Sequence, residues 1–546
     1  MKTKRLPPPD IEYPSVPTLS PDQVLNAYNQ ACPGPNYCNN RTPVTSNLKL
    51  EGWKKYEAII AEQDVTLIPQ LECGFTMGIN PDCDIQIPVN NHASAYKEYQ
   101  VIDKFVVKHY NDGSILGPYK VNPLPVDIKP SPLQVAESSS GKKRPVLDMS
   151  YPKGKSVNNA IPEKWNEISG FEGEFKLPTH DNICKAILST KDPLMFITDL
   201  QAYYMQLPSD WNDTPLMAFI WRDAIFLHRR LPFGCRSSCL HAQRVTDAVV
   251  RVYCRLTGQH IDGYVDDFAS IVARLISAHA YAFFHALLDE LGLLRSIEKC
   301  QSPDLIRIFL GLVYNLADMV MTIPEDKLLR AVHMLEAWLT KDTCTKTQVQ
   351  SLLGHINHLS VVVHAGRPFT ARIVDMLRES EFPVVVSADL KQDIQVWLDF
   401  LTSPQFTRSC IIKSQELVAH DETLKLAVHG QTCVICCDGV FGAYKLTTKS
   451  PHIPHHAMYA VAVWQAVEKH ILEFAGKVIK VAVPSKKATL VINRAKTDMH
   501  YLRPMIRRMW MLQAWNDCIV KAVKVQTNNN SEMYSIFHDF IEVTLP

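Results

Sequence analysis

The sequence has no long hydrophobic run and no regular cysteine framework. No stretch reaches the ~18 consecutive apolar residues of a membrane-spanning helix, and the first residues, with prolines at positions 7–9, lack the apolar core of a signal peptide. The 15 cysteines are scattered, so in a reducing compartment they are most simply buried or surface thiols. We expect a soluble intracellular protein without membrane contact. The composition does not distinguish nucleus from cytoplasm.

Zinc is the one metal that the cysteines suggest, and their spacing disfavours it. The candidate ligands are Cys32, Cys38, Cys73 and Cys83. The members of the first pair are six positions apart and those of the second pair ten. Zinc modules use tighter pairs, with about two to four residues between ligands.

The sequence also has little net charge: the formal value is +1. This is little for a nucleic-acid-binding protein, because phosphate binding depends on clustered Lys and Arg. The distribution of charge is more informative than the sum. Between Lys477 and Lys524 there are 11 Lys or Arg residues against Asp498 and Asp517. This stretch predicts a basic surface that follows a duplex backbone; the alternative is a set of solvated helix faces.

Length and periodicity predict several domains and particular elements. A chain of 546 residues with 46% hydrophobic content suggests three or four domains, at ~150 residues each. Apolar residues at helical or alternating intervals predict the elements as follows. Helices are expected over 49–63, 237–256, 278–291 and 325–339, strands over 196–200 and 225–228, a hairpin over 261–269, and a helix to His358 after a capping box at Thr345 and Gln348.

Three aspartates in this pattern are candidates for catalysis. Asp266 and Asp267 follow Tyr264 and Val265 between two apolar runs, and Asp199 ends another apolar run some seventy positions upstream. An aspartate pair in a turn is often only turn chemistry. Two strands that deliver three carboxylates to one place, however, supply the hard oxygen ligands that two divalent ions need for phosphoryl transfer.

The order of motifs around these aspartates resembles that of reverse transcriptases. Asp199 is followed by Tyr204, by a Leu-Pro-Phe-Gly segment, by the Tyr-Val-Asp-Asp segment and by two further motifs. The segments with this order are 142–150, 156–162, 199–204, 231–234, 264–267, 293–299 and 309–312. Residues 351–358 and 366–369 resemble the segment after the thumb in retroelements of the tyrosine-recombinase (DIRS-like) group; the gypsy-like group is the neighbouring possibility.

The resemblance implies an α+β fold in which a right-hand polymerase with fingers, palm and thumb precedes a ribonuclease H-like α/β domain. The implied domains are a partly ordered N-terminal extension (1–95), fingers (96–191), a palm with the carboxylates (192–315), thumb and connection (316–385) and the ribonuclease H-like domain (386–546).

The resemblance also assigns roles to individual residues. Asp199, Asp266 and Asp267, with the backbone carbonyl of Leu200, would bind two Mg²⁺ ions, for which Mn²⁺ is a possible substitute. The residues expected to contact the incoming nucleotide are Arg144 at the triphosphate, Tyr204 at the sugar, Phe233 and Gly234 in a close-approach turn, and Lys299 near the leaving pyrophosphate. Tyr203 stands where the family usually has alanine, which would add bulk beside the nucleotide.

In the C-terminal domain the resemblance implies a lost nuclease site. Residues 434–443 resemble the first strand of a ribonuclease H fold, with Asp438 as its leading metal-binding aspartate. Ala457, Ser485 and Tyr534 fall where the other carboxylates are expected. Two ions need several carboxylates, so the domain is expected to have lost cleavage activity. A shift of a few residues would instead place Glu468 or Glu473 in the site.

The function implied is an RNA-directed DNA polymerase that extends a primer 3′ end. Its partners would be an RNA template, a DNA primer, an RNA–DNA hybrid and deoxynucleoside triphosphates. The alternative is a non-catalytic nucleic-acid-binding protein derived from a retroelement. The oligomeric state stays open.

Overall fold

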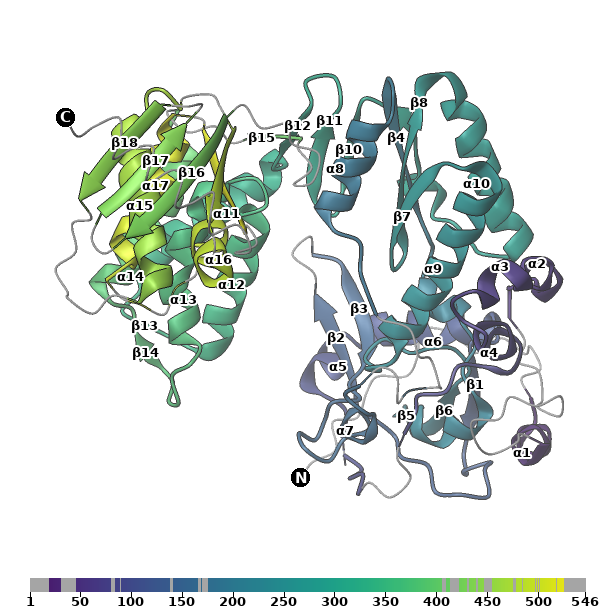
Figure 1. The fold of residues 1–546 in the computed structure, drawn as a ribbon. Helices are drawn as coiled ribbons and strands as arrows, with labels where there is room; N and C mark the ends of the chain where they lie inside the picture. Colours follow the sequence, from purple (N-terminus) through teal and green to yellow (C-terminus); the bar gives the residue numbers. More distant parts are fainter. Residues whose placement is uncertain are drawn as a thin grey trace, which may run out of the picture. The chain divides into compact units, whose positions relative to one another are not determined.

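The chain divides into two compact units that both mix helices and strands (Figure 1). The first comprises residues 1–186 and 190–307, and the second 187–189 and 308–546. The computed structural model describes residues 19–30, 46–79, 84–88, 90–137, 141–164, 168, 175–404, 409–412, 422–429, 432–437, 440–445, 454–474, 478–483, 485–495, 497, 499, 501–516 and 518–524. The predicted α+β class is confirmed. Within those ranges no helix is long and apolar enough to cross a membrane.

A four-stranded antiparallel sheet is the centre of the first unit. Its strand order is β7-β8-β4-β9, so β4 lies inside the sheet, and its apolar residues are buried. Helices α9 and α10 pack their apolar sides against this sheet in one core. The elements are β4 (Pro193–Asp199), β7 (His260–Tyr264), β8 (Asp267–Ala273), β9 (Gln301–Asp304), α9 (Ser238–Thr257) and α10 (Ser277–Leu291).

Three short helices from the N-terminal part belong to the same core. Trp53 is fully buried and donates its indole N–H to the Leu291 carbonyl at 2.9 Å. Asp64 forms a buried ion pair with Arg244 of α9 at 2.7 Å. The helix expected over 49–63 is divided into two. These helices are α2 (Leu50–Lys55), α3 (Glu57–Ala61) and α4 (Leu67–Cys73).

The remainder of the first unit surrounds a second buried cluster. It contains the three-stranded sheet β1-β6-β5 and the two-stranded β2-β3 hairpin. The bounds are α1 (Pro21–Gln30), α5 (Ala93–Lys97), α6 (Tyr99–Asn111), β1 (Ile115–Tyr119), β2 (Leu133–Glu137), β3 (Lys143–Leu147), α7 (Val157–Ala160), α8 (His180–Ser189), β5 (Ala218–Trp221) and β6 (Ala224–His228), with the 3₁₀ turns η2 (Tyr203–Gln206), η3 (Trp211–Leu216), η4 (Arg274–Ile276) and η5 (Ile297–Lys299).

The second unit begins with small sheets and a group of helices. Its first sheet has the order β10-β11-β12-β15, and β13 pairs with β14. The bounds are β10 (Ile306–Phe309), β11 (Leu312–Asn315), β12 (Val320–Thr322), α11 (Glu325–Leu339), β13 (Thr343–Cys344), α12 (Lys346–Leu359), η6 (His364–Thr370), α13 (Ala371–Met376), β14 (Val384–Val385), α14 (Ala388–Thr402) and β15 (Ser409–Ile411).

The C-terminal part of this unit is a five-stranded mixed sheet with three helices. The order is β18-β17-β16-β19-β20, with β16 to β18 antiparallel and β19 and β20 parallel to β16. The bounds are β16 (Glu422–His429), β17 (Thr432–Cys437), β18 (Val440–Lys445), α15 (His455–His470), β19 (Val478–Val483), α16 (Lys486–Arg494), α17 (Arg503–Trp515) and β20 (Ile519–Lys524). The prediction of an α/β domain here is confirmed.

Ion pairs connect this C-terminal part to the helices before it. Arg507 of α17 lies 2.6 Å from Asp393 of α14, which is 2% exposed and also pairs with Arg372 at 2.8 Å. Arg503 pairs with Asp375 of α13 at 2.9 Å. Two arginines of the predicted basic stretch are therefore used within the protein.

Candidate active site

The three candidate carboxylates converge at one end of the central sheet. Asp199 is the last residue of β4 and faces Asp267, the first residue of β8, across the two strands. Directly opposed residues in antiparallel strands have Cβ atoms about 5 Å apart. Asp266 lies in the turn between β7 and β8, and its carbonyl accepts the Leu200 N–H at 2.8 Å. Asp199, Asp266 and Asp267 therefore occupy one small region.

Burial and the neighbouring carboxylates raise the pKa of Asp266 and Asp267. Burial, together with the neighbouring Asp266 and Asp199, raises the pKa of Asp267 to about 7. Burial is also the main cause that raises the pKa of Asp266, and Asp199 adds to it. Carboxylates that repel one another in a partly desolvated site bind positive charge strongly.

Lys299 supplies positive charge to this site. Its ammonium donates to both oxygens of Asp199, at 2.8 and 2.7 Å. Burial lowers the pKa of Lys299, but the bonds to Asp199 outweigh it and the net pKa is raised. A backbone hydrogen bond explains the position of Lys299. The Ser296 N–H donates to the Asp199 carbonyl at 2.8 Å and holds η5 beside the end of β4.

The donor chemistry of the site fits divalent cations, although Lys299 now neutralises one ligand. Among the described residues, no three His, Cys, Asp or Glu side chains are already arranged around a single point as a metal site. Both Asp199 oxygens are engaged by the ammonium. Three clustered carboxylates supply the oxygen ligands that Mg²⁺ and Mn²⁺ prefer. Binding of ions by Asp199 therefore requires Lys299 to turn away.

Tyr204 and Phe233 lie together beside the carboxylates. Their ring centroids are 4.9 Å apart, and Phe233 is 39% exposed. Burial raises the pKa of Tyr204, so its hydroxyl stays protonated at neutral pH. Gly234 follows with φ +109°, and a Cβ there would lie 1.9 Å from the Leu147 carbonyl oxygen. The glycine is needed because the turn passes directly against β3.

Lys143 and Arg144 are neighbours in β3, so their side chains point to opposite faces of the strand. Lys143 pairs with Glu98 at 2.7 Å. Arg144 is exposed and lies close enough to Asp266 for its charge to oppose the rise in the pKa of that carboxyl. Arg144, rather than Lys143, is therefore available to an anionic ligand at the site.

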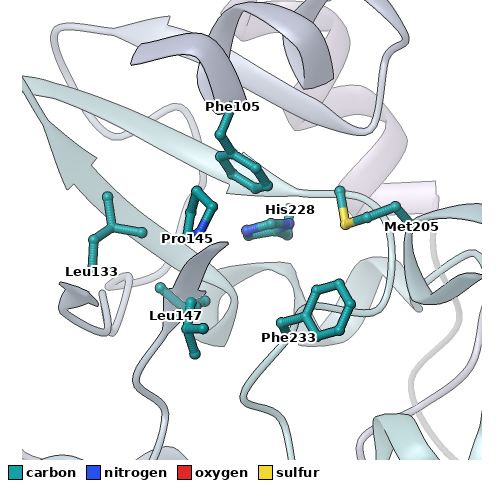
Figure 2. Close-up of a pocket in the computed structure, with 8 residues that line it drawn as sticks. Phe105, Leu133, Pro145, Leu147, Met205, His228 and Phe233 are labelled. Carbon is teal, nitrogen blue, oxygen red and sulfur yellow. The ribbon is translucent and has the colours of Figure 1, made fainter. Parts of the chain in front are cut away.

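A small apolar pocket lies behind Phe233 (Figure 2). Phe233 lines it together with Phe105, Leu133, Pro145, Val146, Leu147, Met205 and His228. His228 is 2% exposed, and its Nδ1 has no hydrogen-bond partner among the described residues. Burial, with some contribution from His109, lowers the pKa of His228 to about 3.

The buried neutral His228 predicts acid sensitivity. The unfolded chain binds a proton at this residue below about pH 6.5, whereas the folded chain does so only near 3, so stability is present above pH 6.5 and is lost as pH falls. Between pH 8 and pH 5 this amounts to about 2 kcal/mol. His228→Phe should remove that part of the pH dependence in urea unfolding. The exposed His279→Gln is the control, and equal slopes in both variants would contradict the assignment.

Tyr203 does not have the position expected from the resemblance. The prediction that its bulk lies beside the nucleotide is wrong, because Tyr203 is 3% exposed and packs in the sheet and α9 core. Its hydroxyl lies 3.0 Å from both the Ala242 carbonyl and the Thr246 hydroxyl. The extra side chain contacts α9.

Several polar residues support the site although no sequence pattern predicts a role for them. Asn158 donates to the Gly234 carbonyl at 2.7 Å and accepts the Arg236 N–H at 2.9 Å, so it supports the Phe233–Gly234 turn. Gln243 and Thr246 of α9 bond to the backbone of the Asp266 hairpin. Their partners are distant in sequence, and no local pattern indicates them.

The strand order of the C-terminal sheet differs from the one expected. Residues 434–443 are not the first strand, because β16 precedes them and is the strand parallel to β19. Cys437, which precedes Asp438, pairs with Leu424 near the start of β16, whereas Ser485 follows the end of β19. Along a strand of ~3.3 Å per residue these points are on the order of 15 Å apart.

Other predicted positions in this part have structural roles or are not described. Ala457 is fully buried in α15, and Ser485 caps α16 by accepting the Ala488 N–H at 3.2 Å. Glu468 pairs with Arg508 at 3.4 Å, and Glu473 with His470 at 3.1 Å. Asp438 and Tyr534 lie outside the described residues.

The basic stretch is weaker than its composition suggests. Arg503 and Arg507 are paired with aspartates of the same unit. Lys486, Lys487 and Arg494 are exposed on α16, and Lys477 and Lys496 lie outside the described residues. Of the zinc candidates, Cys73 is buried and takes part in no disulfide among the described residues, and Cys32, Cys38 and Cys83 are not described.

Comparisons with known proteins find likeness in structure alone. No protein-family model matches the chain, and a search of curated proteins finds no match. Among solved structures, a foamy viral protease-reverse transcriptase in complex with double-stranded DNA is 15% identical, with a TM-score of 0.49, covering 89% of this chain and 96% of the other.

Two related structures give similar values. The dRH form of the foamy viral enzyme with double-stranded DNA has a TM-score of 0.48 at 15% identity, covering 96% of this chain and 84% of the other. The foamy viral enzyme with an RNA/DNA hybrid has a TM-score of 0.46 at 16% identity, covering 93% and 63%. At these values the likeness says nothing about activity.

Proposed function

We propose that this chain is an RNA-directed DNA polymerase that adds deoxynucleotides to the 3′ end of a primer. The observation that carries the proposal is the convergence of Asp199, Asp266 and Asp267 on two adjacent strands, with the pKa of two of them raised by burial and mutual repulsion. Structural aspartate pairs in turns are usually solvated and need no third carboxylate. The segments 351–358 and 366–369 further favour a retroelement of the DIRS-like group over the gypsy-like group.

The acidic residues of the site would bind metal ions, and the basic residues would bind phosphate groups. Two bound Mg²⁺ ions would activate the primer hydroxyl and stabilise the charge that develops on the phosphates. Asp199, Asp266 and Asp267 would hold those ions, with the Leu200 carbonyl as a further oxygen ligand. Lys299 would leave Asp199 and meet the pyrophosphate. Arg144 would bind the triphosphate through two donors.

The nucleic-acid partners follow from the same reaction. The foamy viral structures contain double-stranded DNA in two cases and an RNA/DNA hybrid in the third. We extend these partners to this chain as an RNA template, a DNA primer and their hybrid, with deoxynucleoside triphosphates as substrates. The choice of RNA as template is supported by the motif order.

Primer extension tests the proposal directly. The full chain is incubated with a labelled DNA primer on an RNA template or on a DNA template of the same sequence, with Mg²⁺ or Mn²⁺. Extension on the RNA template that stops when EDTA is added supports the proposal. Hybrid binding without extension under either metal would instead make the chain a non-catalytic nucleic-acid-binding protein.

Tyr204 is predicted to restrict the sugar. Tyr204→Ala opens the site beside Phe233, so incorporation of ribonucleotides should rise about tenfold relative to deoxyribonucleotides, because a lost steric exclusion is worth about 1–3 kcal/mol. DNA synthesis should fall only in part. The measurement is kcat/KM for each nucleotide type. Tyr204→Phe keeps the ring and is the control. If the alanine variant chooses between ribonucleotides and deoxyribonucleotides as the natural protein does, Tyr204 only packs in the core and does not restrict the sugar.

The C-terminal domain is predicted to bind a hybrid without cutting it. Binding through Lys486, Lys487 and Arg494 should weaken steeply with added salt, as counterion release requires. RNA cleavage should be absent, and Asp438→Asn should change nothing in a hybrid-degradation assay. Charge reversal of Arg494, with Lys346→Glu as the control, should lower hybrid affinity. Magnesium-dependent cleavage that is lost in Asp438→Asn would contradict the prediction.

A further inference from the structure

The hairpin that carries Asp266 and Asp267 turns at a residue with an unfavourable backbone conformation. Val265 has φ +54°. A β-branched residue rarely adopts the left-handed region, because its Cβ substituents crowd the backbone. Such strain persists only where the surroundings hold the residue in place, and it is common at functional sites. Asp266 and Asp267 directly follow Val265, so their positions depend on this conformation.

Two side chains of α9 bond both backbone polar groups of Val265. Gln243 accepts the Val265 N–H at 2.8 Å and donates to the Gly263 carbonyl at 2.9 Å. Thr246 donates its hydroxyl to the Val265 carbonyl at 2.5 Å. The helix approaches closely because position 263 is glycine, where a Cβ would lie 2.3 Å from the Thr246 methyl carbon.

Further contacts orient these two side chains. A helical threonine ordinarily bonds back to the carbonyl four residues earlier, which here is that of Ala242. The Tyr203 hydroxyl lies 3.0 Å from that carbonyl and 3.0 Å from the Thr246 hydroxyl, so Thr246 is directed to the hairpin. The Gln243 amide also donates to Asp247 at 2.7 Å, which fixes its orientation.

We propose that Tyr203, Gln243 and Thr246, here called the hairpin brace, hold Val265 in its left-handed conformation and thereby position Asp266 and Asp267. They are positioning residues, since their bonds go to the hairpin backbone and to α9. The inference rests on the proposed polymerase function for its effect on catalysis. The brace itself is a property of the protein without substrate, and it is tested separately.

Thr246→Val tests the brace with little change in shape, because it replaces a hydroxyl by a methyl group. Thr257→Val is the matched control: it is on the same helix, and its hydroxyl bonds to the Tyr253 carbonyl at 2.7 Å, away from the hairpin. Thr246→Val should lower kcat about tenfold, equivalent to about 1.4 kcal/mol, and raise the half-saturating Mg²⁺ concentration severalfold. The KM for the nucleotide should stay within about twofold, because Arg144 and Tyr204 are unchanged.

A second variant tests whether the strain at Val265 is what the brace opposes. Glycine adopts φ +54° at no steric cost, so Thr246→Val should cost less activity in a Val265→Gly background than in the natural one. Tyr203→Phe, which removes the contacts of this hydroxyl with Thr246 and the Ala242 carbonyl and leaves both bonds from α9 to Val265, should give a smaller loss than Thr246→Val. Equal losses from Thr246→Val in both backgrounds would overturn the link to the strained conformation.

Hydrogen exchange gives a readout that does not need activity. In the protein without substrate or metal, Thr246→Val should speed amide exchange about tenfold in peptides that cover 261–268, while Thr257→Val leaves them unchanged. Unchanged exchange in both variants would overturn the brace. Faster exchange in a wild-type-like fold that extends no primer would overturn the polymerase function and leave the brace standing.

Discussion

Replacing Asp266 by asparagine is expected to reduce DNA synthesis by at least about 10³-fold, equivalent to about 4 kcal/mol of transition-state stabilisation. The variant keeps the size of the side chain and removes one negative charge from the ions' ligands. Single-turnover primer extension measures the loss. Because the carboxylates repel one another, and burial raises the pKa of Asp266, the urea midpoint should not fall.

A matched variant separates this effect from a general loss of the fold. Asp223 is exposed in the turn between β5 and β6, with φ +59°. Asparagine tolerates that conformation as well as aspartate does. Asp223→Asn should therefore keep full activity. If Asp266→Asn were as active as the natural protein, Asp266 would not be a metal ligand.

Replacing Asp393 by alanine is expected to destabilise the second unit by about 3–5 kcal/mol, because it leaves Arg507 partly buried without its carboxylate partner and leaves Arg372 paired with Asp389 alone. Both arginines bond to this carboxylate, at 2.8 and 2.6 Å. Urea unfolding measures the change, and amide exchange in α17 should increase. Asp393→Asn retains one acceptor and should cost less.

Asp399→Ala on the same helix is the control for Asp393→Ala. Asp399 of α14 is exposed, and its carboxylate accepts a hydrogen bond from Gln395 at 2.8 Å. Exposed pairs of this kind contribute about 0–1 kcal/mol. A similar loss of stability in both variants would show that the Arg372–Asp393–Arg507 network contributes no more than a surface contact.

Local patterns predicted the elements that depend on local physics. The helix expected over 325–339 has those bounds, and the one expected over 237–256 differs by one residue at each end. Thr345 and Gln348 form the predicted capping box at α12. In each case an apolar stripe of helical period or an N-terminal cap is contained within a few consecutive residues.

Contacts between distant segments were not predictable in the same way. Nothing near Tyr203 indicates that its hydroxyl reaches Thr246, which lies on a helix formed some forty residues later. The assignment of 434–443 as the first strand is wrong because β16 precedes this segment, and only the parallel pairing of β16 with β19 identifies β16 as the central strand. Pairing partners are set by tertiary packing, which a single strand's pattern does not encode.

The ion pairs of α17 also affect which changes to the C-terminal part the rest of the second unit tolerates. Arg503 and Arg507 hold α17 to Asp375 and Asp393. Deleting the five-stranded sheet together with α17 would take one arginine partner from each of these acids, which also pair with Arg372 and Arg378, so a substitution elsewhere in this part costs the neighbouring helices less than loss of the whole part.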